Sequence, residues 1–180
     1  EVGGFANGGY TNIEFHDGIT KINKEAFIGS SLSGELVLPP NLKFLGGKAF
    51  AGTKITKIIF PESLKLMGDG NYNTEGTFTN CKYLMGTVTL PKNVVRLPGG
   101  CFAGCSGITG LVIPEGIDII SENAFNGWSS LNSIVCEDVE PPLVLENAFY
   151  GVNKDNFTVE VPKGCVEKYK NAPGWSDFKR

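Results

Sequence analysis

The chain has 180 residues, with 24 glycines, five cysteines and one histidine, and 41% of its residues are hydrophobic. A chain of this length buries about 70% of the surface that its unfolded form exposes, so we expect it to fold without a disulfide or a metal. Sixteen Lys and Arg against 19 Asp and Glu give a net charge of −3, which argues against nucleic acid as a partner. No apolar run approaches the ~18 residues of a membrane span, so we expect a soluble chain without one.

The chain opens with a glycine-rich stretch, residues 1–12, and a strand-like segment, residues 13–18. The second segment matches residues 111–116, so the chain repeats itself. We therefore predict that residues 1–18 form a partial N-terminal coil, in which residues 1–12 are either a frayed end or a cut through a longer array. No charged and then apolar leader is present, so an export signal has either been removed or was never there.

A short motif of the type Ala-Phe-x-Gly then recurs along the chain. Its phenylalanines are Phe27, Phe50, Phe78, Phe102, Phe125 and Phe149. The steps between them are 23, 28, 24, 23 and 24 residues. Because the motif is too short for a stable helix, we expect a 3₁₀ or single helical turn closed by a left-handed glycine. The phenylalanines are predicted to be buried in one column.

A short apolar alternation, usually ended by a proline, follows each phenylalanine. The segments are residues 36–39, 58–61, 88–91, 111–114, 134–136 and 159–162. They are predicted as strands of about three residues, because the proline that ends them has no N–H for a further ladder bond. A strand that recurs every 23 or so residues cannot form a hairpin with the next, so the strands are expected to lie parallel, one in each coil.

The repeat therefore predicts an α/β-type solenoid of about six coils. We expect a right-handed solenoid with a parallel sheet of short strands on one face and 3₁₀ or irregular segments opposite. No single coil can bury its own apolar face, so the ends need caps.

The middle residue of each strand is predicted to face solvent, because side chains alternate along a strand. These residues are Val37, Ile59, Thr89, Val112 and Val135, with Glu14 and Glu160 at the ends. Glu35, Lys57, Thr87 and Ser133 would form a polar border. Such a stripe is typical of a ligand-binding face, since contiguous apolar patches mark interaction sites. The alternative is that β-branched residues occupy these positions for their strand preference alone.

The long step between Phe50 and Phe78 contains a polar insertion, residues 69–75, which we expect to protrude and to be mobile. Asp69, Asn71 and Asn73 begin like a calcium-binding loop. The similarity then fails, because Thr74 replaces the turn glycine and Asn80 replaces the bidentate glutamate. We favour a surface loop and predict no metal site.

The five cysteines are Cys81, Cys101, Cys105, Cys136 and Cys165, without any Cys-x-x-Cys pair. Cys81 and Cys105 each lie three residues after a column phenylalanine, so a disulfide between neighbouring coils is one alternative. The favoured alternative is that all five are buried free thiols that fill space as small apolar side chains.

Little in the sequence is typical of an enzyme. A Ser-His-Asp or Cys-His arrangement would need His16, which we expect in an exposed turn because it occupies a position that proline holds elsewhere. No nucleotide-binding or nucleophile motif is present. We predict no catalytic residue and no cofactor.

The C-terminal segment, residues 162–180, is predicted as a cap. Residues 165–170 place apolar side chains at helical spacing, and Pro173 and Gly174 end the helix. Trp175 and Phe178 are expected to fold back over the last coil.

These motifs resemble the BspA-like leucine-rich repeat family of bacterial cell-surface proteins, in its Bacteroidetes type. The resemblance runs from Ile13 to Phe178 and includes the two prolines at 141–142 and the closing segment 161–175. It implies one leucine-rich repeat domain over residues 1–180 that is exported to the cell surface or outside the cell. The implied function is non-enzymatic binding of a protein or glycan, in adhesion to host or other cells.

A function from another class stays open. The coils would then serve as a structural spacer or capping domain of a larger surface protein, without a ligand of their own. Extra coils upstream would favour this alternative. The sequence leaves the identity of a ligand and the oligomeric state open.

Overall fold

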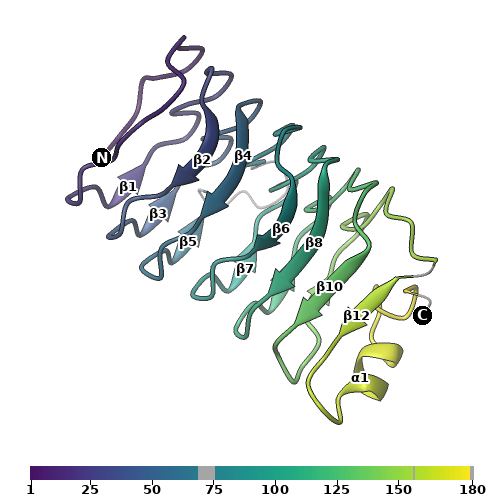
Figure 1. Cartoon of the computed structure of the whole chain (residues 1–180). Coiled ribbons are helices and arrows are strands. Elements are labelled where there is room, and N and C mark those ends of the chain that lie inside the picture. Colours follow the sequence, from purple (N-terminus) through teal and green to yellow (C-terminus); the bar gives the residue numbers. More distant parts are fainter. Residues whose placement is uncertain (69–75, 156, 179–180) are drawn as a thin grey trace.

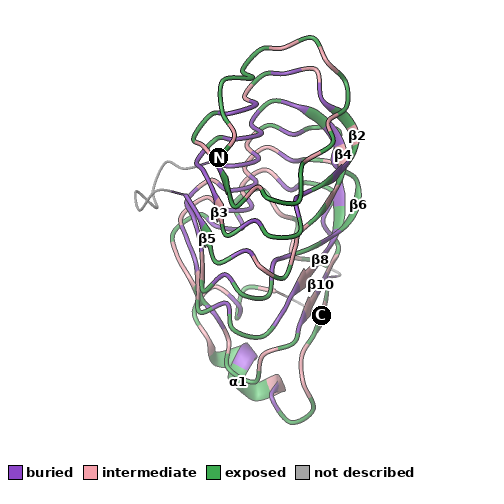
Figure 2. Ribbon diagram, turned by 90° about the vertical axis from the view of Figure 1, so that its left-hand side faces the viewer, coloured by how far each residue is buried: buried purple, intermediate pink, exposed green. Residues whose placement is uncertain are grey.

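A computed structural model describes residues 1–68, 76–155 and 157–178. The coils stack one on another along a single axis, and each contributes one strand to the row of arrows in Figure 1. Buried residues line the inside of the coils and exposed residues their outside (Figure 2). The predicted solenoid of parallel strands is thereby confirmed.

The longer strands form a parallel sheet along one side of the stack, which we call the long sheet. Its strands are β2 (Ser33–Val37), β4 (Lys54–Ile59), β6 (Gly86–Thr89), β8 (Ile108–Ile113), β10 (Ser133–Cys136) and β12 (Thr158–Glu160). β2 pairs with β4, and β6, β8, β10 and β12 pair in that order.

A second row of strands, the short sheet, was not predicted from the sequence. Its strands are β1 (Lys21–Ile22), β3 (Phe44–Leu45), β5 (Leu66–Met67), β7 (Arg96–Leu97), β9 (Ile119–Ile120) and β11 (Leu143–Val144). β1, β3 and β5 form one parallel group, and β7, β9 and β11 form another. Two residues are too few to show the alternation by which a strand is recognised.

The Ala-Phe-x-Gly motifs form a third side of the stack, the phenylalanine side. All six predicted rings are at most 4% exposed, and neighbouring rings stack with centroids 5.1 to 6.2 Å apart. The predicted column is confirmed. Each motif is a series of tight turns, such as those closed by the N–H groups of Ala26 and Ile28 on the carbonyls of Asn23 and Glu25. The left-handed glycine is present, with φ 64° at Gly29.

Both sheets are interrupted at the same level of the stack, between the coil of β4 and β5 and the coil of β6 and β7. Among the described residues beside the long strands, one backbone hydrogen bond crosses the break, from the N–H of Met85, just before β6, to the Thr56 carbonyl of β4 at 3.2 Å. The phenylalanine side is continuous, because Phe50 N–H donates to the Thr77 carbonyl at 3.0 Å. The predicted protruding insertion, residues 69–75, lies outside the described residues.

The N-terminal residues make contacts of the kind that join the coils. Val2 forms a parallel bridge with Ile22, and Phe5 N–H donates to the Ala26 carbonyl at 2.8 Å. The Phe5 ring stacks on Phe27 at 5.3 Å. The column therefore extends by one ring beyond the six that the sequence analysis identified.

The opposite end is closed by a short helix and two aromatic rings, as predicted. Helix α1 (Val166–Asn171) follows β12, and the chain then turns back over the last coil. Trp175 and Phe178 pack on Phe149 with ring centroids 5.8 and 5.2 Å away. Trp175 Nε1 donates to the Pro142 carbonyl at 2.9 Å, which fixes the ring in place.

Candidate functional site

The residues predicted for the outer face lie in one row of the long sheet. Strand register places Val37 beside Ile59, Thr89 beside Val112, and Val112 beside Val135. Val37 and Ile59 are 55% and 41% exposed, and Thr89 is also exposed. Val112 and Val135 are half-buried. We call this row the outer row.

A polar row borders it, two positions earlier in each strand. Glu35 and Lys57 are both exposed, with the Lys57 ammonium 3.8 Å from the Glu35 carboxylate. Such an exposed pair is worth at most about 1 kcal/mol, so it contributes more to the surface charge pattern than to stability. Thr87 is exposed and Ser133 is half-buried, while Glu160 pairs in register with Val135 and ends the outer row.

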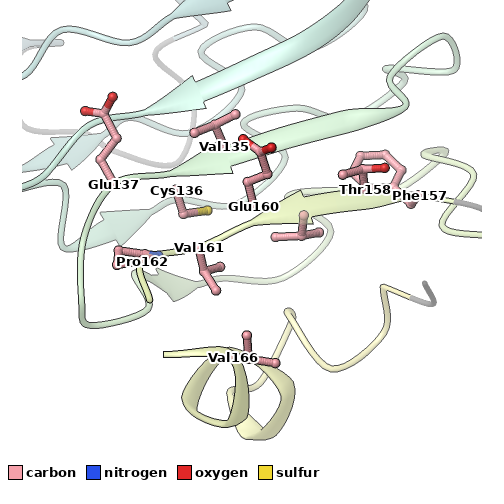
Figure 3. A pocket seen from close by; sticks show the side chains of 10 residues that line it. Val135, Cys136, Glu137, Phe157, Thr158, Glu160, Val161, Pro162 and Val166 are labelled. Atoms are coloured by element: carbon pink, nitrogen blue, oxygen red, sulfur yellow. The ribbon is translucent and has the colours of Figure 1, made fainter. Parts of the chain in front are cut away.

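Two hollows open beside the outer row. The larger, of about 960 Å³, lies between the ends of β10 and β12 and the helix α1. Val161 and Val166 lie on its two sides, and the side chains of Val135 and Glu160 lie close to it (Figure 3). The smaller, of about 480 Å³, lies at the break in the long sheet and is lined by Ile58, Phe60 and Thr89, among others.

The titratable groups are arranged as structural residues. His16 is exposed, and its Nδ1 accepts the Gly18 N–H at 3.0 Å within a turn, as the sequence predicted. All five cysteines are free and buried, which confirms the prediction of buried free thiols in place of a disulfide. Cys81 and Cys105 donate their thiol hydrogens to the Phe50 and Phe78 carbonyls at 3.1 and 3.2 Å.

Burial makes these thiols poor nucleophiles. It raises the pKa of Cys81 to about 11 and that of Cys136 to about 12, and it raises the pKa values of Cys101 and Cys105 still further. Because the thiolate is the reactive form, these groups stay inert near neutral pH. Within the ranges that the structure describes, no three His, Cys, Asp or Glu side chains gather as metal ligands would. Over the same ranges, no helix has the length and apolar character to cross a bilayer.

A second apolar row, on the outside of the short sheet, was not predicted from the sequence. Phe44 and Ile119 are half-buried there, and Leu66 and Leu143 are 40% and 51% exposed. The Lys21 ammonium lies 5.4 Å from the centre of the Phe44 ring. Each of these apolar residues is the first residue of its short strand. The recurrence of an apolar residue at this position of the coil is the signal by which the row could have been found.

The sequence matches a family model. The model of the BspA type leucine-rich repeat region matches in six copies, over residues 2–75 and 72–169. A comparison with curated proteins found no match.

Two solved structures match this chain. A leucine-rich cell surface protein from Faecalibacterium prausnitzii A2-165 shares 19% identity with a TM-score of 0.59, over 85% of this chain and 54% of that one. This chain thus spans about half the length of that protein. The leucine-rich repeat protein of T. pallidum shares 19% identity with a TM-score of 0.48, over 81% of this chain and 68% of that one.

Proposed function

Since the chain belongs to the BspA-type leucine-rich repeat family, we propose that it is a non-enzymatic binding domain of an exported bacterial surface protein. Its ligand is a protein or a glycan, and its function is attachment to a host or to other cells. The similar Faecalibacterium protein is itself a cell surface protein, which supports the proposed location.

The observation that carries the proposal is the outer row of the long sheet. Val37 and Ile59 expose large aliphatic side chains in register on neighbouring strands. Val112 and Val135 continue the row beyond the break. An apolar stripe of this kind, bordered by the charges of Glu35 and Lys57, has the apolar centre and polar rim of an interaction surface.

The test is a binding screen of the purified chain against mucosal glycans and extracellular-matrix proteins. For any ligand found, the double change Ile59→Glu and Val112→Glu is expected to abolish binding and to leave the melting temperature nearly unchanged. The matched control is Leu66→Glu with Leu143→Glu, which places the same charges on the short sheet and should leave binding intact. If the control and not the outer-row variant loses binding, the ligand lies on the short sheet.

The spacer alternative is favoured by one observation at the N-terminal end. Phe5 continues the aromatic column but is 44% exposed, so it offers a surface on which a neighbouring part of a larger protein can pack. This alternative expects no binding to either ligand panel by the unmodified chain.

A further inference from the structure

At the break in the long sheet, β4 directs unpaired main-chain groups toward β6. Leu38 N–H donates to the Ile59 carbonyl at 3.2 Å, which shows that the main-chain groups of Ile59 point toward β2. Because these groups alternate in direction along a strand, the N–H and carbonyl of Ile58 point the other way, into the break.

β6 does the same from the opposite side. Leu90 N–H donates to the Val112 carbonyl at 3.0 Å, so the main-chain groups of Leu90 point toward β8. By the same alternation, the N–H and carbonyl groups of Thr87 and Thr89 point toward β4. Since β4 and β6 form no ladder, these groups keep their full capacity to bond another main chain.

The break also uncovers side chains that other coils bury. Ile58 and Phe60 occupy interior positions of β4 and the residue after it, yet both are half-buried. Their counterparts in the preceding coil, Leu36 and Leu38, are each 3% exposed. The hollow of about 480 Å³ lies over this uncovered interior, and its size falls in the range of ligand sites.

The geometry of the stack allows this break to widen. The two coils are held on the phenylalanine side, where Phe50 and Phe78 stack at 5.7 Å. The break is closed at one end by the hydrogen bond from Met85 N–H to the Thr56 carbonyl. Beyond the strands it is closed by Glu62, whose carboxylate lies 2.6 Å from the Lys92 ammonium and whose carbonyl accepts a hydrogen bond from the Asn93 side-chain amide at 2.6 Å. The ion pair is exposed to solvent, where such pairs contribute little to stability, so a ligand can displace it.

We propose that the break between β4 and β6 binds an extended segment of a partner protein as an inserted parallel strand. The inserted segment pairs with the main chain of Ile58 on one side and of Thr87 and Thr89 on the other. Its apolar side chains, at alternate positions, cover Ile58 and Phe60. This inference rests on the proposed function as a binding domain, and it names a peptide as the ligand.

In the described part of the chain, no further strand pairs with the outer edge of β12, but this edge offers the main chain of one strand only. The break presents two facing edges and an uncovered interior between them. An inserted segment therefore forms hydrogen bonds on both sides and buries apolar surface at the same time, which favours the break over the end of the sheet.

The test is amide hydrogen exchange followed by NMR on the full chain. The probe is a capped synthetic peptide with the sequence of residues 33–38, which carries the apolar pattern of the protein's own strands. In the free protein, the amides of Ile58, Thr87 and Thr89 are expected to exchange much faster than that of Val112. Millimolar peptide is expected to slow the three amides about tenfold or more. The same peptide N-methylated at its first leucine is the control and should have no effect.

Protein variants separate insertion from surface binding. Phe60→Ala is expected to weaken peptide binding about tenfold, because it removes the apolar floor of the site. Glu62→Gln, which removes the closing ion pair, is expected to tighten binding a few-fold. Tyr150→Ala is the control, since this residue is 68% exposed beside Phe149, in a coil away from the break, and should leave peptide affinity unchanged.

Four outcomes would overturn the inference. The first is that the three amides are already protected in the free protein, and the second is that the peptide protects none of them. The third is that the peptide protects only the amides of β12, and the fourth is that the N-methylated peptide protects the three amides equally well. If protection of these amides rises with protein concentration in the absence of peptide, the segment that enters the break belongs to a second copy of the chain and not to a partner protein. None of these results bears on the ligand screen, so failure of the inference and failure of the proposed function are distinguishable.

Discussion

At the scale of single residues, stability is concentrated in the aromatic column. The centroid of the Phe102 ring lies 5.2 Å from that of Phe78 and 6.2 Å from that of Phe125. The Trp128 ring packs against it in a T-shaped arrangement, with the centroids 5.9 Å apart. Trp128 Nε1 donates to the Phe102 carbonyl at 2.8 Å. If a ring in the middle of the stack is removed, the neighbouring side chains therefore cannot move to fill the space.

The change Phe102→Ala is expected to lower the free energy of unfolding by about 3 to 5 kcal/mol, because it leaves a cavity inside the column. Urea unfolding measures this loss. The control is Tyr150→Ala, which removes a ring that is 68% exposed and should cost no more than about 0.5 kcal/mol. Equal stabilities of the Phe102 variant and the parent would contradict the buried column.

The buried thiols predict how stability depends on pH. Burial holds the pKa of Cys81 near 11 and that of Cys136 near 12, and it raises the pKa of Cys101 further. In the unfolded chain, a thiol titrates at about 8.5. The contribution of these groups is therefore complete below about pH 8.5 and is lost as the pH rises, by up to about 1.4 kcal/mol per pH unit for each thiol.

Denaturant unfolding between about pH 7.5 and about pH 10 checks this dependence. Cys101→Ala is expected to make the decline shallower. The variant should fold, because alanine occupies the same position of the motif in other coils, as at Ala49 and Ala124. If the free energy of unfolding stays level or increases over this pH range, folding does not raise the pKa values of the thiols.

At the scale of the elements, the close approach of one pair of coils depends on Gly46. A Cβ added to Gly46 would lie 2.3 Å from the Lys24 nitrogen and 2.5 Å from the Asn23 carbonyl carbon, both in the main chain of the preceding coil. Gly46 N–H also donates to the Ile22 carbonyl at 2.8 Å. The two coils cannot keep this hydrogen bond and admit a methyl group.

Gly46→Ala is therefore expected to destabilise the fold by about 3 kcal/mol through overpacking. Thermal unfolding measures the effect. Gly9→Ala is the control, because a Cβ at Gly9 would meet open space and should change stability by less than about 0.5 kcal/mol. A Gly46 variant as stable as its control would mean that the coils lie further apart than described.

The sequence predicted the long sheet and the aromatic column because each has a clear signal. The alternation around Val37 identifies a strand and its outward residue, and the spacing of Phe27 from Phe50 gives the coil. The break had no such signal. Ile58 and Val88 look equivalent in sequence, but only the contact between their two coils decides whether each is paired. The exposure of Val112, half-buried where Val37 is exposed, likewise depends on neighbouring strands.

At the scale of the whole molecule, the break separates the stack into two groups of coils. Neither sheet continues across it, and the phenylalanine side carries most of the contact between the groups. In a repeat protein, stability is approximately the sum of each coil and its contacts with its neighbours. Weak coupling at one level therefore allows the two groups to unfold separately.

Phe27→Ala is expected to reveal this behaviour, because Phe27 is fully buried in the N-terminal group. Its loss should allow residues 1–68 to exchange their amide hydrogens at low denaturant while residues 76–178 stay protected. Native-state hydrogen exchange measures the two regions separately. The control, Phe125→Ala, removes a ring of the C-terminal group and should affect that group first. Uniform loss of protection in both variants would indicate a single cooperative stack.

The break also decides how the molecule responds to mechanical tension. A pull along the stack acts across the sheets. Where both sheets join two coils of one group, the coils resist it with two ladders of hydrogen bonds and a pair of stacked rings. At the break, the ladders are absent, and the resistance comes from the stacked rings of Phe50 and Phe78 and from the few hydrogen bonds that cross it. This level is the most compliant one, so it extends more than the others under tension. Two stiff segments joined by one elastic level would lengthen under force before any coil unravels.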